Sequence, residues 1–188
     1  MRVLLKKRVF LVLVLGLIAI LFLKSDWLGE YMYPVYYKDD IRASASNYGL
    51  EPHLVAAVIR TESNFKTGRQ SDKGAVGLMQ LMPMTAKDVV QRAGFAEVTE
   101  DMLRQRADVS IELGSWYLSS LQQRFDQNKI AAIAAYNAGP SRVSEWLNTG
   151  KWDGKLETVK QIPYGETRHY VQRVIYYYNK YKELYSDF

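Results

Sequence analysis

One acidic residue of this chain falls at a position where an acid is costly. Glu62 lies on the apolar side of the helix that the spacing of apolar residues predicts from Pro52 to about Ser63. Because burial disfavours an ionised carboxylate, such a group keeps its proton to higher pH. A carboxylic acid still protonated near neutral pH is what general-acid cleavage of a glycosidic bond requires. Position alone leaves a second interpretation open, a helix-end carboxylate that bends out into water.

Two further segments place polar side chains where sugars could be recognised. Gln80 follows Gly77 and Met79, and its neutral amide suits the hydroxyl or acetamido groups of a sugar. Tyr136 and Asn137 end a run of small and apolar residues typical of a buried helix, where polar side chains need partners. Each segment also has a structural interpretation. Gly77 could be a turn glycine, Met79 a core residue, and Tyr136 with Asn137 a hydrogen-bonded pair.

A family resemblance rests on four motifs that occur together and in order, each of which alone would be weak. They are Glu62-Ser63, Gly77-Leu78-Met79-Gln80-Leu81-Met82-Pro83, Ala135-Tyr136-Asn137-Ala138-Gly139 and Ile162-Pro163-Tyr164-Gly165-Glu166-Thr167-Arg168-His169-Tyr170-Val171. With them the chain resembles the catalytic domain of the soluble-lytic-transglycosylase type, enzymes that cut the glycan strands of peptidoglycan. The resemblance covers most of residues 41–184. One departure is visible at Val109 and Ser110, where the family often has Asn and Pro.

The resemblance implies a mainly α, lysozyme-like domain with a substrate cleft and one dominant acid. Ordinary glycoside hydrolases use two carboxylates. Lytic transglycosylases instead take the nucleophile from the substrate, the 6-hydroxyl of the N-acetylmuramoyl residue, so water is not a reactant. By resemblance, Glu62 is catalytic: it protonates the glycosidic oxygen and then accepts the proton of that hydroxyl as the 1,6-anhydro ring closes. No cofactor and no metal ion is expected.

The resemblance also implies a set of substrate-binding residues, namely Ser63, Gly77, Met79, Gln80, Tyr136, Asn137, Glu166 and Tyr170. Tyr136 is expected to orient the acid or the developing oxocarbenium charge, and Asn137 to bind the acetamido group or fix the site. Glu166 and Tyr170 are four residues apart and share one helical face. Tyr170 is therefore expected in the cleft with Glu166 in support, although a surface Glu and a core Tyr would give the same spacing.

The net charge of +5 is concentrated at the amino terminus. Residues 1–24 contain five Lys or Arg and no acid, so the remainder has 25 − 5 = 20 basic against 20 acidic side chains. A neutral remainder without a basic stripe argues against nucleic acid as a partner. The absence of cysteine excludes disulfides, thiolate nucleophiles and cysteine-based zinc sites.

The amino-terminal segment predicts a membrane anchor. An uncharged run over 9–23 follows a basic cluster, and this asymmetry predicts a cytoplasmic amino terminus with the rest outside. We expect a basic cytoplasmic tail over 1–8, a transmembrane signal-anchor over 9–28, a juxtamembrane segment over 29–40 and a catalytic domain over 41–188. A cleaved signal peptide is the alternative, but no Ala-x-Ala site follows the apolar run. The chain is thus expected to be a single-pass membrane protein, monomeric, with peptidoglycan glycan strands as its partner.

The remaining patterns predict a series of helices. The expected segments are 39–48, 52–63, a helix that starts at Thr85 and ends at Gly94, a short one after Thr99, a long one after Asp108, 129–137 capped by Asn128, 141–147 and 166–184. The loop over 65–77 could be turn-rich or a short β-ribbon. Two other functions fit a lysozyme-like fold: a hydrolytic muramidase of the goose-lysozyme kind, or an inactive module that binds peptidoglycan as a scaffold.

Overall fold

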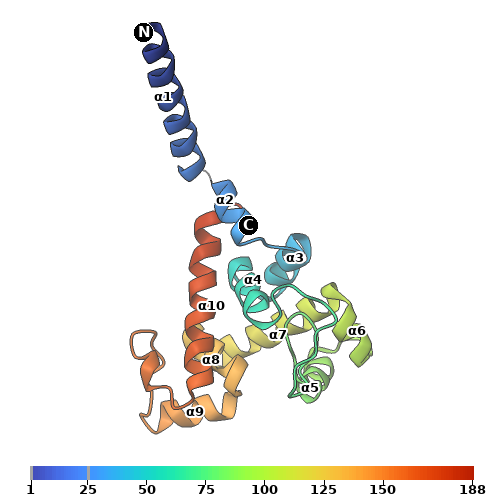
Figure 1. Ribbon diagram of the computed structural model, residues 1–188. Coiled ribbons are helices and arrows are strands. Elements are labelled where there is room, and N and C mark those ends of the chain that lie inside the picture. Colours follow the sequence, from blue (N-terminus) through green and yellow to red (C-terminus); the bar gives the residue numbers. More distant parts are fainter. Residues whose placement is uncertain (1, 25) are drawn as a thin grey trace. The chain divides into compact units, whose positions relative to one another are not determined.

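The computed structural model describes the backbone of residues 2–24 and 26–188, and the side chains of these residues except 2–6, 9, 19, 22–24 and 26. The chain divides into two compact units, Met1–Val35 and Tyr36–Phe188. In the described residues, the regular elements of both units are helices, and loops connect them (Figure 1).

The first unit consists of two helices, α1 over Arg2–Lys24 and α2 over Asp26–Met32. Within residues 2–24 and 26–188, no helix combines the length and apolarity that crossing a membrane requires. The signal-anchor predicted over 9–28 spans the end of α1 and the start of α2, and residue 25 lies outside the described residues. The membrane anchor therefore stays a prediction from the sequence.

The second unit contains the remaining helices. They are α3 over Lys38–Tyr48, α4 over Pro52–Glu62, α5 over Pro83–Ala93, α6 over Glu100–Gln105, α7 over Ala107–Arg124, α8 over Lys129–Ala138, α9 over Pro140–Asn148, the 3-10 helix η1 over Val159–Gln161, and α10 over Gly165–Leu184. The mainly α fold class is confirmed. The loop between α4 and α5 contains two isolated antiparallel bridges, Gln70 with Val76 and Val76 with Leu81. It is thus mostly turns, with the beginnings of a ribbon.

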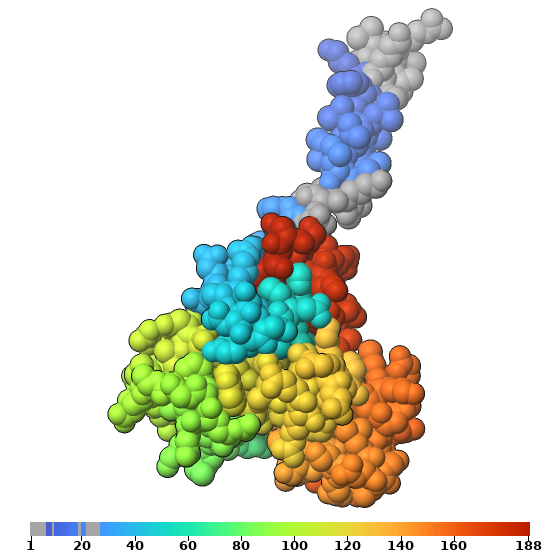
Figure 2. All heavy atoms as spheres, turned by 180° about the vertical axis from the view of Figure 1, so that it is seen from behind, coloured from blue at the N-terminus to red at the C-terminus, as the bar shows by residue number. Residues whose placement is uncertain are grey.

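Helices α4 and α8 form the centre of this unit. Helix α4 packs against α10 and α3, while α8 packs against α7, α9 and α10. Residues 54–59 of α4 and 131–136 of α8 are buried throughout. Small side chains such as those of Ala131 and Ala132 allow the neighbouring helices to approach α8 from several sides. Figure 2 shows α5 and α6 on one side of this unit, and α9 with the following loop on the other.

The helix starts confirm two predicted caps and correct a third. The side chain of Thr99 accepts a hydrogen bond from the Met102 amide, and that of Asn128 accepts one from the Ala131 amide. Thr85, in contrast, does not cap α5, which begins at Pro83. Proline has a backbone dihedral already suited to the first turn of a helix and lacks only an N–H group that would be unpaired there. The capping-box pattern at Thr85 was therefore outweighed by the proline two residues earlier.

Candidate active site

Glu62 is the last residue of α4 and faces a cavity of about 320 Å³. The cavity is lined by residues from four parts of the second unit: the end of α4, the loop that follows it, the end of α8 and the start of α10. The lining residues are Glu62, Ser71, Asp72, Lys73, Ala75, Gln80, Met82, Tyr136, Asn137 and Glu166. The fold thus brings together residues that are more than a hundred positions apart in the chain.

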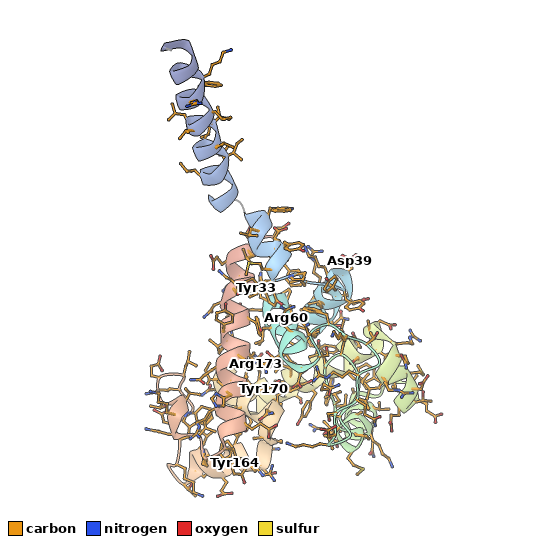
Figure 3. All side chains as sticks on the ribbon, viewed as in Figure 1. Tyr33, Asp39, Arg60, Tyr164, Tyr170 and Arg173 are labelled. Carbon is orange, nitrogen blue, oxygen red and sulfur yellow. The ribbon has the colours of Figure 1, made fainter. Side chains whose placement is uncertain are left out.

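The carboxyl group of Glu62 has one direct protein partner recorded in the described residues, Tyr170. The Tyr170 hydroxyl donates a hydrogen bond of 2.6 Å to Glu62 Oε1. Tyr170 itself is buried where α10 packs on α4, so its hydroxyl is held in place. Figure 3 labels Tyr170 and, one turn further along α10, Arg173.

Burial is the largest influence on the ionisation of Glu62. It raises the pKa of Glu62 from 4.5 to about 7, against the lowering effects of the Tyr170 hydrogen bond and of the Arg69 and Arg173 charges. The Glu166 charge adds a smaller increase. A group with this pKa is present in both protonation states near neutral pH, which suits a residue that donates a proton and then accepts one.

Tyr136 forms part of the cavity wall but does not bond to the acid. Its hydroxyl donates to the Met79 carbonyl oxygen at 2.9 Å, and its ring is buried. Burial raises the pKa of Tyr136 well above its ordinary value, and the nearby Glu62 charge raises it further, so the phenol stays neutral. The hydrogen bond to the acid comes from Tyr170. The role expected of Tyr136, to orient the acid or the developing oxocarbenium charge, stays a prediction.

The other predicted residues on the cavity are each held by a hydrogen bond. Asn137 Oδ1 accepts a bond of 2.8 Å from the Thr167 hydroxyl, which ties α8 to α10. The amide nitrogen of Gln80 donates to the Gly77 carbonyl oxygen at 2.8 Å and so fixes its own turn. Glu166, at the start of α10, accepts a bond of 3.0 Å from Lys73.

Four predicted residues are not among those that line the cavity: Tyr170, which meets Glu62 as described above, and three residues at the end of α4 or in the loop after it. Ser63 is fully buried and its hydroxyl donates to the Ile59 carbonyl oxygen at 3.3 Å. Met79 is also fully buried, and its backbone amide donates to Ser110 Oγ at 3.1 Å. Gly77 is buried as well and lies at the base of the loop. In the structure these residues support the cavity from behind and do not line it.

The loop residues Ser71, Asp72 and Lys73 line the cavity but were not singled out by the sequence. In the sequence these residues form part of a polar segment between two glycines, which indicates a loop and no particular function. The course of the loop, however, depends on contacts with α6, such as the bond from the Gly68 amide to the Arg104 carbonyl oxygen at 2.8 Å. Long-range contacts of this kind have no local sequence pattern.

A second cavity has a volume of about 750 Å³. It runs between α5 and α7 and is lined by Met84, Thr85, Asp88, Arg92, Tyr117, Ser120, Leu121, Gln123, Arg124 and Pro140. The rings of Tyr117 and Tyr136, one from each cavity, are in contact, with their centroids 5.4 Å apart. The two cavities therefore share an aromatic wall.

Comparison with known proteins finds lytic murein transglycosylases. Soluble lytic murein transglycosylase of Escherichia coli is 34% identical over 161 residues, which cover 84% of this chain and 25% of that protein. Membrane-bound lytic murein transglycosylase C of Yersinia pestis is 30% identical over 154 residues, covering 71% of this chain and 43% of that protein. The chain therefore spans about a quarter of the first relative's length.

Solved structures agree with this fold. An inactive mutant of the lytic transglycosylase Slt from Pseudomonas aeruginosa has a TM-score of 0.75 and 37% identity, covering 82% of this chain and 25% of that one. The 70 kDa soluble lytic transglycosylase of Escherichia coli has a TM-score of 0.79 and 32% identity, and the match covers 85% of this chain and 26% of that one. That enzyme has also been solved in complex with bulgecin A. A family model described as the transglycosylase SLT domain matches residues 39–159, more than half of the sequence, and this chain belongs to that family.

Proposed function

We propose that this protein is a peptidoglycan lytic transglycosylase, which cleaves the β-1,4 bond between N-acetylmuramic acid and N-acetylglucosamine without water. The observation that carries the proposal is the state of Glu62, a cavity-facing acid with a pKa of about 7 and a hydrogen bond from a buried tyrosine. The two relatives described above are both named lytic murein transglycosylases, which supports the same substrate.

The proposed reaction uses Glu62 twice. As an acid it gives its proton to the glycosidic oxygen while the bond from that oxygen to C1 of the muramoyl residue breaks. The carboxylate that remains then takes the proton of the muramoyl 6-hydroxyl, whose oxygen forms a bond to C1. The products are a 1,6-anhydromuramoyl end and a free N-acetylglucosamine 4-hydroxyl. Glu62 ends protonated, as it began, so no cofactor is consumed.

The surrounding residues have supporting roles in this proposal. Tyr170 orients the Glu62 carboxyl group and stabilises its ionised form through the 2.6 Å hydrogen bond. Tyr136 offers a ring face to the sugar, while Gln80 and Asn137 present amide groups to its hydroxyl or acetamido substituents. Ser63, Gly77 and Met79 hold the backbone behind them. This division follows from which side chains line the cavity and which are buried.

The main competing function is hydrolysis by a muramidase. Glu166 and Asp72 also line the cavity and could in principle serve as a second carboxylate. Glu166, however, is paired with Lys73, and its side chain is 67% exposed, unlike an acid desolvated for catalysis. An inactive peptidoglycan-binding scaffold is the other alternative. The raised pKa of Glu62 favours an enzyme, since a binding module has no use for a costly buried acid.

Product mass separates these functions. The full chain, purified in detergent, is incubated with purified peptidoglycan beside Glu62→Gln and a control, Glu157→Gln, which changes an exposed acid outside the cavity. We expect products lighter by one water than hydrolysis products from the wild type and the control, and none from Glu62→Gln. Hydrated reducing ends would establish a muramidase. Binding of glycan without any product would favour the scaffold.

The cellular location is a further part of the proposal. We place a basic cytoplasmic tail at 1–8, a signal-anchor at 9–28, a juxtamembrane segment at 29–40 and a monomeric extracytoplasmic catalytic domain at 41–188. The uncharged run over 9–23 and the basic residues before it support this arrangement. Some relatives are named membrane-bound and others soluble, so the family is compatible with an anchored enzyme.

A further inference from the structure

Helix α4 is tied to α10 at both of its ends by a hydrogen bond between a tyrosine and a glutamate. At the end of α4, the Tyr170 hydroxyl donates to Glu62 Oε1 at 2.6 Å. At its start, the Tyr178 hydroxyl donates to Glu51 Oε2 at 2.5 Å. Tyr170 and Tyr178 lie about two turns apart on the buried side of α10, which packs along α4 (Figure 1). One helix thus holds both ends of the other.

The bond at the start of α4 belongs to a cluster that also includes α8. Lys129, the first residue of α8, donates to Glu51 and, at 2.9 Å, to the Tyr178 hydroxyl oxygen. Lys182 Nζ, one turn further along α10, lies 3.5 Å from Glu51 Oε2. Glu51, Tyr178 and Lys129 therefore join the start of α4 to α8 and α10, and we call these three residues the α4 clamp.

Glu51 is ionised at neutral pH, so the α4 clamp is held by charge-assisted hydrogen bonds. Burial raises the pKa of Glu51, but the bonds from Lys129 and Tyr178 and the charges of Lys129 and Lys182 outweigh burial and lower this pKa from 4.5 to about 2. Hydrogen bonds to an ionised acceptor are stronger than neutral ones. The clamp therefore stays closed throughout the pH range in which Glu62 titrates.

The three helices that the α4 clamp joins are those that carry the site. Helix α4 ends at Glu62, α8 ends with Tyr136 and Asn137 on the cavity, and α10 carries Tyr170. The apolar contacts along α4 are not directional, so they fix its position along α10 less closely than hydrogen bonds do. The clamp residues are not among those that line the cavity. They can act on the reaction through the positions of the helices.

We infer that the α4 clamp is a positioning site for the catalytic acid: by fixing α4 along α10, it keeps Glu62 within hydrogen-bonding distance of Tyr170. This inference rests on the proposed function. A bond from a hydroxyl to a carboxylate needs its two oxygens about 2.5–3.0 Å apart, so a small displacement of α4 weakens it. The acid then loses orientation, and its carboxylate loses part of the stabilisation that the tyrosine supplies.

The charges around Glu62 are separate from the clamp. Those with the largest influence on the Glu62 pKa are Arg69 of the loop after α4 and Arg173 and Glu166 of α10. Tyr136 of α8, whose raised pKa keeps it neutral, also faces the acid. A substitution in the clamp leaves all of these groups in place.

The test compares Tyr178→Phe, which changes no charge, with Glu51→Gln, which removes a negative one. For the full chain in detergent acting on purified peptidoglycan, we expect each to lower kcat about threefold with KM unchanged. The alkaline limb of the pH–rate profile should rise by about half a unit, part of what loss of a whole hydrogen bond gives. Acting through space, loss of the Glu51 charge would lower the Glu62 pKa, so a rise identifies a change of geometry.

Tyr48→Phe is the matched control. The Tyr48 hydroxyl donates to Glu112, so this bond also joins a tyrosine and a glutamate, but of α3 and α7, which carry neither Glu62 nor Tyr170. Tyr48→Phe should destabilise the fold, as Tyr178→Phe does, without moving the limb, and urea unfolding measures both losses. A limb that moved equally in this control would mean that any lost bond between helices has the same effect, and would overturn the inference.

A double variant shows whether the clamp acts through the bond to the acid. In a chain that already carries Tyr170→Phe, adding Tyr178→Phe should move the limb no further, because the bond that the clamp maintains is absent. Equal shifts in the two backgrounds would overturn the inference. So would an unmoved limb in both Tyr178→Phe and Glu51→Gln.

A second readout does not depend on turnover. With carbon-13 in the glutamate carboxyl groups of the full chain, NMR follows the titration of Glu62, whose resonance is assigned by its loss in Glu62→Gln. Tyr178→Phe should raise this pKa by the same half unit, and Tyr48→Phe should leave it unchanged. A wild type that gave no product would reject the proposed function while the titration still decides the inference. Anhydro products with a titration unmoved by Tyr178→Phe would keep the function and reject the clamp.

Discussion

At the scale of single residues, the hydrogen bond from Tyr170 to Glu62 fixes the orientation of the acid and partly offsets the effect of burial on its pKa. A donor to a carboxylate stabilises the ionised form, so the bond lowers the pKa that burial raises. Without it, Glu62 would hold its proton to still higher pH while losing its fixed orientation. The two consequences have different signatures in kinetics.

Tyr170→Phe is therefore expected to lower kcat roughly 10-fold and to move the alkaline limb of the pH–rate profile to higher pH. In the wild type that limb should fall through about pH 7, because the protonated acid is lost as pH rises through its pKa. The measurement is kcat/KM against pH, with Tyr176→Phe, an exposed tyrosine of the same helix, as the control. A limb that stays in place would mean that the hydroxyl does not bond to Glu62 in solution.

The same pKa makes a prediction about stability. Glu62 has a pKa of about 7 in the folded state and 4.5 as an unperturbed group, so between these values the folded chain holds a proton that the unfolded chain releases. The resulting stabilisation is full below pH 4.5 and is lost as pH rises through 7. Glu62→Gln does not titrate, so it should become more stable than the wild type by up to about 3 kcal/mol at pH 8.

Urea unfolding of the two proteins at a series of pH values measures this difference. The wild type should match the variant near pH 4.5, lose stability relative to it as pH rises from 4.5 to about 7, and stay less stable at higher pH. Equal pH dependence in both proteins would show that Glu62 ionises like a solvated glutamic acid, and would remove the main support for its role as a general acid.

The sequence could single out Glu62 because an acid on an apolar helix face is visible in the spacing of its neighbours. It could not assign the partner of that acid. Both Tyr136 and Tyr170 occur in motifs, and only the packing of α10 against α4 places Tyr170 at 2.6 Å while the Tyr136 hydroxyl bonds to Met79. Ser63 was misplaced for a similar reason, since the direction of its side chain depends on how α4 ends.

At the scale of elements, the loop between α4 and α5 positions one wall of the cavity, and Gly77 holds it against α6 and α7. Its φ of 81° lies in the left-handed region. A Cβ atom there would collide with the Leu103 carbonyl oxygen and lie 2.7 Å from Ser110 Oγ. The first of these neighbours is backbone and cannot turn away.

Gly77→Ala is expected to destabilise the fold by about 2–4 kcal/mol, the sum of left-handed strain and overpacking. Gly94→Ala is the matched control, since Gly94 has a φ of 69° but nothing within 4 Å of the added atom. It should cost only about 1 kcal/mol. Thermal or urea unfolding measures both. Equal losses in the two variants would mean that the close approach to α6 does not constrain the loop.

Helices were more predictable than this loop because their signals are local. Thr99 and Asn128 were identified as caps from adjacent residues alone, and both accept the expected backbone bonds. On α10, Tyr170 and Val174 are buried and four residues apart, and the same spacing continued would favour Tyr177 or Tyr178. Tyr178 is buried, whereas Tyr177 is partly exposed. The residues of a short segment are enough to predict that it forms a helix. Which side of that helix is buried depends on the elements that pack against it.

At the scale of the whole molecule, charge and apolarity are divided between the two units. Five basic residues and no acid occur in residues 1–24, and the rest is formally neutral. The described apolar side chains of α1 are widely exposed, with Phe10 at 69% and Val12 at 68%. Exposed apolar surface on this scale is costly in water and indicates contact with another apolar phase or partner.

The proposed membrane anchor can be tested by asking whether the chain is bound to membranes through its amino-terminal segment. The full chain should sediment with membranes and resist extraction by high salt and alkali, whereas a chain that starts at Asp26 should be released, because the uncharged run over 9–23 is then absent.

A second variant tests the orientation in the membrane separately from membrane binding. With Arg2, Lys6, Lys7 and Arg8 changed to Gln, the chain should stay in the membrane but lose its fixed orientation. Protease protection of a carboxyl-terminal tag in sealed vesicles reads that orientation. Sequencing the amino terminus of the membrane form distinguishes an anchor from a leader, since a chain that begins after Leu23 would mean that the segment is cleaved.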